Sequence, residues 1–119
     1  MFIPHRGDIH KDHRVTYEAA LVAARPINNC TVKRIYAYET LSETEWAAPF
    51  GDNVFIPTVF INIENEIEDK LKAFHFFTSQ IKQFPHSRSP EIIRVLSNYR
   101  GATVGFSNAE AFMLIRSIE

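Results

Sequence analysis

Cysteine, glycine and long apolar runs are all scarce in this chain of 119 residues, and each scarcity excludes a class of protein. The single cysteine, Cys30, cannot form an internal disulfide, so a disulfide-stapled scaffold is excluded and a reducing, cytoplasmic setting is expected. No apolar run approaches the roughly 18–20 residues that a membrane-spanning helix needs. Four glycines and six prolines are too few for a fibrous or low-complexity chain.

An excess of charge of either sign is also absent. Thirteen Lys and Arg residues against fourteen Asp and Glu give a net charge of −1, so no basic face for nucleic acid is expected. What is present is ordinary for a globular protein: 45% of the residues are hydrophobic and 13% are aromatic. A chain of this length makes one domain, so residues 1–119 are expected to fold together around one core.

The order of apolar and turn-forming residues predicts an α/β fold. The predicted elements are a helix over residues 15–25, strands over 32–38 and 59–63, a helix over 64–82 and a helix from Pro90. Residues 111–115 suit a closing strand or a short helix, and their length favours the strand. Asp8 is expected to cap the first helix, which Pro26 ends, and Ser89 to cap the helix that begins at Pro90. Residues 1–4 resemble the end of a strand whose beginning is missing, which predicts an incomplete sheet.

Histidine is concentrated at the start of the chain, where His5, His10 and His13 fall within the first thirteen residues. In the first turn of a helix, positions 10 and 13 point the same way. Two imidazoles on one face, with Asp12 between them, suit a metal ligand and an acid–base partner. Two neighbouring histidines at the head of a helix also occur as plain surface residues. A catalytic zinc needs three protein ligands, and the sequence offers no clear second and third.

Several blocks of the sequence resemble one enzyme family. Residues 4–13, Pro-His-Arg-Gly-Asp-Ile-His-Lys-Asp-His, are similar to the second metal-site motif of the LmbE/PIG-L deacetylases, written H-x-D-H. Further blocks that continue the resemblance are residues 18–26, 38–40, 42–46, 55–63, 79–80, 85–89, 100–101 and 109–112. The resemblance therefore extends over essentially the whole chain.

This resemblance implies a fold and a missing part. The fold would be the C-terminal part of a Rossmann-like, three-layer LmbE-type sandwich with an incomplete sheet. Members of the family also carry an earlier Ala-His-Pro-Asp-Asp motif, which supplies one His and one Asp to zinc and a second Asp as the base. No such motif occurs here. A missing N-terminal half or another subunit is therefore expected to complete the site, and the exposed sheet edge is expected to favour association, including homo-oligomers.

The same resemblance implies roles for the motif residues. His13 would be the zinc ligand that this chain contributes. His10 would stand beside the substrate carbonyl as an imidazolium, and Asp12 would hold His10 and favour its charged form. The implied reaction is zinc-assisted amide hydrolysis that removes the acetyl group from an N-acetylglucosaminyl-type substrate. Zinc promotes such a reaction by lowering the pKa of its bound water from about 15.7 to about 7.

Glu45, Trp46 and Gln80 are the candidate substrate-binding residues. Trp46 could stack on a sugar face, Glu45 could bind sugar hydroxyls, and Gln80 lies near the site by resemblance. Each also has an ordinary interpretation, as a loop anchor, a solvated acid or a helix-surface amide. For the whole chain there are two alternatives to an enzyme part. One is a non-catalytic half-domain that acts as a binding or interaction module, and the other is a fragment with no independent function.

Overall fold

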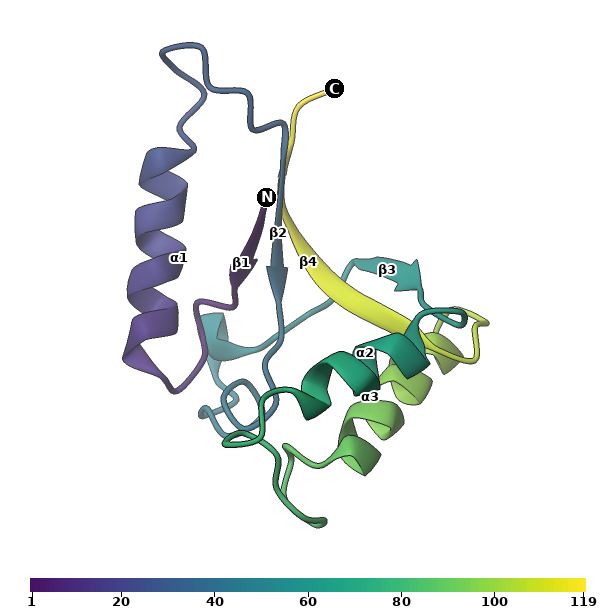
Figure 1. Ribbon diagram of the computed structural model, residues 1–119. Helices are drawn as coiled ribbons and strands as arrows, with labels where there is room; N and C mark the ends of the chain where they lie inside the picture. The colour runs from purple at the N-terminus through teal and green to yellow at the C-terminus, as the bar shows by residue number, and fades with distance from the viewer. The chain divides into compact units, whose positions relative to one another are not determined.

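The computed structural model describes all residues 1–119, and they form two units. The first unit comprises Met1–Val59 and Phe112–Glu119, and the second comprises Phe60–Ala111. Helices and strands follow in the order β1 (Phe2–Pro4), α1 (Lys11–Ala23), β2 (Arg34–Tyr38), the 3₁₀ helix η1 (Gly51–Asn53), β3 (Val59–Asn62), α2 (Ile67–His75), α3 (Pro90–Ala102) and β4 (Ala109–Ser117) (Figure 1). The four strands form one mixed sheet in the order β1-β2-β4-β3. The predicted α/β class is therefore confirmed.

The first unit is built on a strand–helix–strand arrangement. β1 runs parallel to β2, with Ile3 opposite Ala37, and α1 connects the two strands. β2 then pairs antiparallel with the carboxyl-terminal half of β4, with an irregularity in register at Ile35 and Tyr36. In Figure 1 α1 lies alongside β1 and β2. Because parallel strands need a crossover connection, the helix is what allows β1 and β2 to be neighbours.

The core of this unit lies between α1 and the sheet. Its fully buried members are Ile3, Ala24, Ile35 and Ala37. Ile35 and Ala37 alternate along β2 with more exposed residues, as a strand with one face against a core requires. Tyr17, Ala20 and Leu21 on one face of α1 pack against this cluster. The spacing of three and four residues is that of an amphipathic helix.

Aromatic residues gather on β1, β2 and β4. The rings of Phe2 and Tyr36 stack with centroids 5.4 Å apart, and the ring of Phe112 lies 5.1 Å from that of Phe2. Phe112 is buried, whereas Phe2 remains 54% exposed. These contacts add to the stability of the β1–β2–β4 pairing.

The second unit joins α2, α3, the main part of β3 and the beginning of β4 through polar contacts. The Arg94 guanidinium donates to Glu68 over 2.7 Å, which links α3 to α2. The Ser97 hydroxyl, which is buried, lies 2.8 Å from the side-chain oxygen of Asn108 and ties α3 to the segment before β4. Gly101 allows this close approach, because a Cβ there would stand 2.6 Å from the carbonyl oxygen of Phe106.

Two sequence predictions about helices are wrong. Asp8 does not cap α1: the N-cap is His10, whose ring nitrogen accepts the backbone N–H of Asp12, and Asp8 is fully buried. The helix predicted over residues 64–82 is much shorter and ends at His75. Beyond that point Phe76 and Phe77 are 86% and 61% exposed, so these two rings contribute little burial that would support a longer helix.

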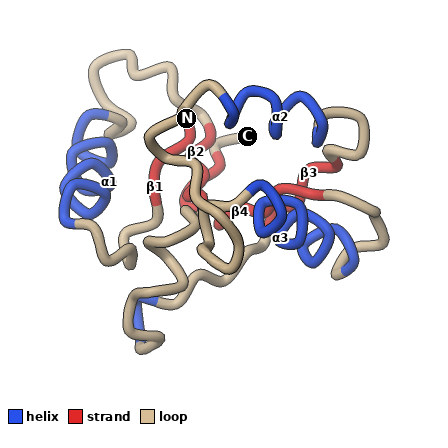
Figure 2. The backbone as a smooth tube through the Cα atoms, turned by 60° about the horizontal axis from the view of Figure 1, so that its bottom comes forward, coloured by secondary structure: helices blue, strands red, loops and turns tan.

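The other elements agree with the predictions to within a few residues. Ser89 caps α3, its hydroxyl accepting the backbone N–H of Ile92, and Pro90 opens that helix. The predicted last strand exists and is longer, as β4, and residues 2–4 are a strand. Figure 2 shows that β2 and β3 are connected mainly by loop. None of the helices has both the length and the apolar character that spanning a membrane requires.

Candidate functional site

The candidate site lies where the chain leaves β1 and β2. The segment from His5 to His10 follows β1 and leads into α1, and residues 40–47 follow β2. Because these strands are parallel, both segments leave the sheet at the same edge. The carboxyl ends of parallel strands are the usual place for a ligand site in an open α/β sheet. The backbone N–H of Ile9 donates to the Glu43 carbonyl over 3.2 Å, so the two segments are in contact.

A buried carboxylate, that of Asp8, organises this edge. Asp8 has no exposed surface. Its Oδ2 lies 2.7 Å from Nδ1 of His13, and its Oδ1 accepts the hydroxyl proton of Thr44 over 2.6 Å. The guanidinium of Arg14 donates to the Asp8 backbone carbonyl over 2.9 Å. Both carboxylate oxygens are thus hydrogen-bonded, as a buried carboxylate requires.

The Asp8 contact determines which way the His13 ring presents its nitrogens. An ionised carboxylate can only accept hydrogen bonds, so the proton in this contact belongs to Nδ1 of His13. In the neutral ring the lone pair is then on Nε2. The His13 side chain is 27% exposed, so it is neither buried in the core nor fully solvated. The arrangement presents an oriented imidazole lone pair.

His10 stands next to His13 at the start of α1. The two ring centroids are 5.5 Å apart and the rings are inclined by 30°. Nδ1 of His10 accepts the backbone N–H of Asp12 over 3.2 Å, so a proton that the neutral His10 ring donates comes from Nε2. The two rings lie side by side, but His10 has an extended backbone as the N-cap and precedes α1, so the two residues do not occupy two helical positions on one face as predicted.

The Asp12 carboxylate does not hydrogen-bond to His10, although its predicted role is to hold that ring. Its carboxylate lies 3.8 Å from Nδ1 of His10 and its side chain is 85% exposed. In this arrangement the contact between the two residues is the backbone N–H of Asp12, not its carboxylate. The carboxylate that holds a histidine here is that of Asp8, and the histidine that it holds is His13.

The candidate substrate-binding residues divide between the two units. Glu45 and Trp46 belong to the same loop as Thr44. The Glu45 carboxylate accepts the backbone N–H of Ser42 over 2.5 Å, and Trp46 is 55% exposed. Gln80 is in the second unit, where its side-chain carbonyl accepts a hydrogen bond from Arg88.

The residues present do not make a complete metal site. In the 119 residues described, no group of three or more His, Cys, Asp or Glu side chains is placed to hold a metal ion. The two oxygens of Asp8 already accept from His13 and Thr44. What the chain offers toward a metal is the Nε2 lone pair of His13, backed by a carboxylate. A catalytic zinc site needs three protein ligands, so the further ligands would have to come from elsewhere.

Gly7 allows the segment before Asp8 to pack closely against η1. A Cβ on Gly7 would stand 2.4 Å from Cα of Asn53 and 2.5 Å from Nε2 of His5. His5 is itself buried, and its Nε2 lies 3.0 Å from the carbonyl oxygen of Asn53. The segment before Asp8 is thereby packed directly against η1, which only a residue without a side chain allows.

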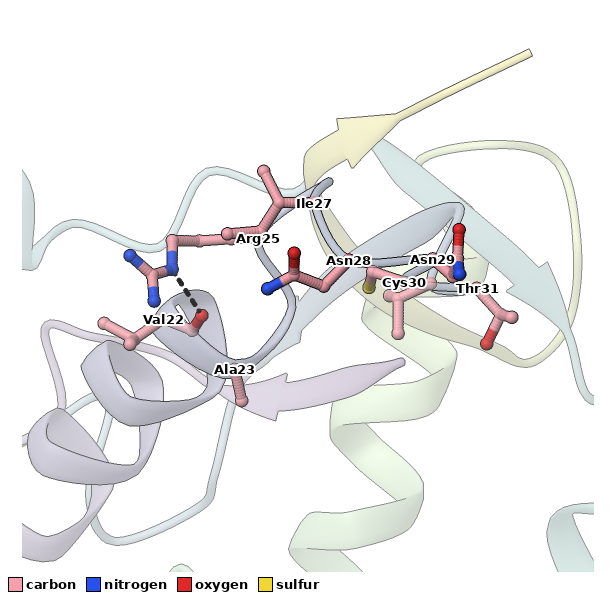
Figure 3. Close-up of a pocket in the computed structure, with 9 residues that line it drawn as sticks. Val22, Ala23, Arg25, Ile27, Asn28, Asn29, Cys30 and Thr31 are labelled. Atoms are coloured by element: carbon pink, nitrogen blue, oxygen red, sulfur yellow. Dashed lines mark hydrogen bonds between the residues drawn. The ribbon is translucent and has the colours of Figure 1, made fainter.

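The structure also contains a depression that is separate from these histidines. It has a volume of about 480 Å³ and is lined by residues 22, 23, 25 and 27–32, at the opposite end of α1 (Figure 3). Asn28 and Asn29 both have a left-handed backbone there, with φ of 50° and 60°. A helix of thirteen residues is about 20 Å long, so this depression is remote from His10 and His13.

Sequence reasoning missed Asp8 and Thr44 as members of the site. The pair Gly7-Asp8 before a helix is typical of a capping position, which concealed the buried role of the carboxylate. Thr44 is 36 residues from Asp8 along the chain, and its only signal was membership of the 42–46 block that carries the family resemblance. Neither the protein-family models nor the curated proteins that were compared with the sequence gave a match.

Proposed function

We propose that this chain is part of a metal-dependent amide hydrolase of the LmbE/PIG-L type, which removes the acetyl group from an N-acetylated amino sugar. The observation that carries the proposal is the buried Asp8 carboxylate bonded to Nδ1 of His13. Metal-ligating histidines almost always donate their second ring N–H to a carboxylate, a backbone carbonyl or water. Burial of a carboxylate is costly, so a fully buried carboxylate is not expected behind a surface histidine that has no function.

The proposed role of His13 is to supply one ligand of a shared metal site. A second polypeptide segment would supply the other ligands and the base, as the Rossmann-like LmbE arrangement implies. Bound zinc contributes a water that loses its proton near neutral pH. Within this chain, Asp8 keeps the His13 lone pair on Nε2 and oriented, and that is the part of the proposal that the geometry supports most directly.

His10 is proposed to act on the substrate. Its Nδ1 is occupied by the Asp12 backbone, so Nε2 carries the proton that can be donated to a carbonyl oxygen or to a departing amine. The neighbouring ring of His13, 5.5 Å away, places that proton close to the proposed metal ligand. Asp12 is proposed to assist through its carboxylate when the ring becomes charged.

The loop that follows β2 is proposed to contact the sugar. Trp46 exposes more than half of its surface beside Thr44, and an exposed aromatic ring is a suitable platform for the apolar face of a sugar. Glu45 is proposed to bind hydroxyl groups with the carboxylate oxygen that does not accept from Ser42. Gln80 is retained as a proposed contact on the family resemblance alone.

Two histidine substitutions test the proposal in a complex of this chain with the N-terminal half of an LmbE-type enzyme. His13→Ala should lose the metal. His10→Ala should keep the metal and lower kcat about a hundredfold, as expected for removal of one oxyanion donor. Metal content and acetate release are measured for both variants, with Lys11→Ala, an exposed neighbour, as the control.

The outcome of this experiment separates the two functions considered for the chain. Equal metal loss in both variants would show that the two histidine roles are misassigned. A complex that forms and binds zinc, yet releases no acetate from an N-acetylglucosamine derivative, would favour a binding module without turnover.

A further inference from the structure

A threonine hydroxyl connects the loop after β2 to the Asp8–His13 pair. Oγ1 of Thr44 donates to Oδ1 of Asp8 over 2.6 Å, and the two residues are 36 positions apart in the sequence. The same oxygen accepts the backbone N–H of Thr40 over 2.8 Å. Thr44 is therefore part of the turn at residues 40–44 and also the second partner of a carboxylate that has no exposed surface.

When Asp8 is ionised, each hydrogen bond in this chain of groups can have only one direction. The Thr40 amide can only donate, so it occupies a lone pair of Thr44 Oγ1, and the one hydroxyl proton of Thr44 goes to Asp8. The Asp8 carboxylate accepts that proton on one oxygen and the Nδ1 proton of His13 on the other. Thr44 and His13 thus both donate to Asp8, one to each oxygen, and together they hold the carboxylate in place.

We propose that Thr44 is a positioning residue: through Asp8 it keeps the proton of the neutral His13 ring on Nδ1 and the lone pair on Nε2. The use of this tautomer for metal binding rests on the proposed function, but the tautomer itself is a property of the chain alone. Without the Thr44 hydroxyl, Oδ1 of Asp8 would be buried with no donor, and the carboxylate would turn toward another donor. A turned carboxylate misaligns Oδ2 with Nδ1 of His13 and so weakens the bond that selects the His13 tautomer.

Thr44 lies in the loop that is proposed to contact the substrate, and its hydroxyl contacts the Asp8–His13 pair. Its sequence neighbours are Glu43, which is buried and whose carbonyl accepts the N–H of Ile9, and Glu45. Ser42 at the tip of the turn is buried with a left-handed backbone, φ 71°, a conformation that an L-residue keeps only when its surroundings impose it.

The tautomer of His13 can be read directly in the chain alone, without metal or substrate. Long-range ¹H–¹⁵N spectra of the ¹⁵N-labelled protein distinguish the charged ring from its two neutral tautomers; they are recorded at rising pH until the neutral form of His13 is observed, and His13 is assigned with His13→Gln. We expect Nδ1 protonated and Nε2 unprotonated in the unmodified chain. Thr44→Val should shift His13 toward the tautomer with the proton on Nε2, and Thr44→Ser should restore the original signals. Thr16→Val, an exposed threonine on α1, is the matched control and should change nothing.

Two results would overturn the proposal. One is an unmodified chain in which His13 carries its proton on Nε2. The other is a folded Thr44→Val variant with unchanged His13 signals, since a purely structural threonine would lower stability without changing the tautomer. If Thr44→Val does not fold, the hydroxyl proton of Thr44 in the unmodified chain decides. It should exchange slowly with water and lie close to the Thr40 amide proton, and rapid exchange would contradict the proposal.

The same variants separate this proposal from the proposed function. In a metal-loaded complex Thr44→Val should lower metal affinity or kcat by about 10–100-fold, the usual effect of removing an outer-shell partner. A tautomer shift in the isolated chain with no acetate release from the complex would leave the positioning role standing and the deacetylase proposal refuted. An active complex in which Thr44→Val leaves the His13 tautomer unchanged would refute the positioning role and leave the deacetylase proposal standing.

Discussion

At the scale of single residues, the defining feature is a carboxylate with no exposed surface that bonds to a half-buried histidine. Burying a charge is costly unless it is hydrogen-bonded, and each oxygen of the Asp8 carboxylate has a donor, His13 for one and Thr44 for the other. Asp12, four residues further along, has an exposed side chain and a distant partner. Removal of the Asp8 side chain should therefore lower the free energy of unfolding more than removal of the Asp12 side chain.

Asp8→Ala should destabilise the chain by about 1–3 kcal/mol, because it removes a buried acceptor and leaves the His13 ring and the Thr44 hydroxyl without their partner. Asp12→Ala should change the free energy of unfolding by less than about 0.5 kcal/mol, the usual range for an exposed position. Urea denaturation of both variants compares the two. If Asp12→Ala cost as much as Asp8→Ala, the assignment of the buried carboxylate would be wrong.

At the scale of secondary-structure elements, short polar contacts determine where segments begin and how they are joined. Glu64, between β3 and α2, shows this in the second unit. One oxygen of its carboxylate accepts both the backbone N–H and the hydroxyl of Ser107, each over 2.7 Å, and the other accepts from Asn62 over 3.1 Å. The Ser107 backbone donor, followed by the Ser107 hydroxyl and the Asn62 amide, lowers the pKa of Glu64 below its usual 4.5.

A lowered pKa in the folded state predicts a definite acid dependence. The stability that Glu64 contributes should be present above its unfolded pKa of about 4.5 and lost as the pH falls through the lower folded value. The Glu64→Gln variant should therefore lose less stability than the unmodified chain as the pH falls from about 4.5 through the lower folded pKa of Glu64. Thermal unfolding followed from neutral to acid pH tests this, with the exposed Glu66→Gln as the control. Parallel acid profiles for the unmodified chain and Glu64→Gln would count against the Ser107 contact.

The elements also show why the sequence predicts some features and not others. The first helix, the strands and the Ser89 cap are local: they depend on periodicity and on residues a few positions apart, so the sequence predicts them well. The end of α2 depends on whether Phe76 and Phe77 find a surface to cover, which no local pattern records. The role of Asp8 depends on Thr44, 36 residues away, and long-range contacts of this kind are not visible in the order of residues.

At the scale of the whole molecule, the question is how many ligands one chain can bring to a metal. The motif residues His10 and His13 are predicted from the sequence and are brought side by side, and the carboxylate behind His13 is added by the fold. No group of three or more potential ligands is assembled within the 119 residues described. A metal that needs three protein ligands should therefore bind tightly only when a partner segment contributes to the site.

This difference in ligand number predicts a difference in zinc-dependent stability. A ligand that binds only the folded state stabilises it by RT ln(1 + [L]/Kd), so about 2.7 kcal/mol is gained when zinc exceeds its Kd a hundredfold. Micromolar zinc should therefore leave the Tm of the isolated chain almost unchanged. It should raise the Tm of the complex with an N-terminal half that carries the Ala-His-Pro-Asp-Asp motif, and His13→Ala should abolish that rise. Calorimetric scans with zinc and with a chelator measure both effects. A stoichiometric, His13-dependent rise in the isolated chain would mean that this chain completes the metal site by itself, in a ligand arrangement different from the one described here.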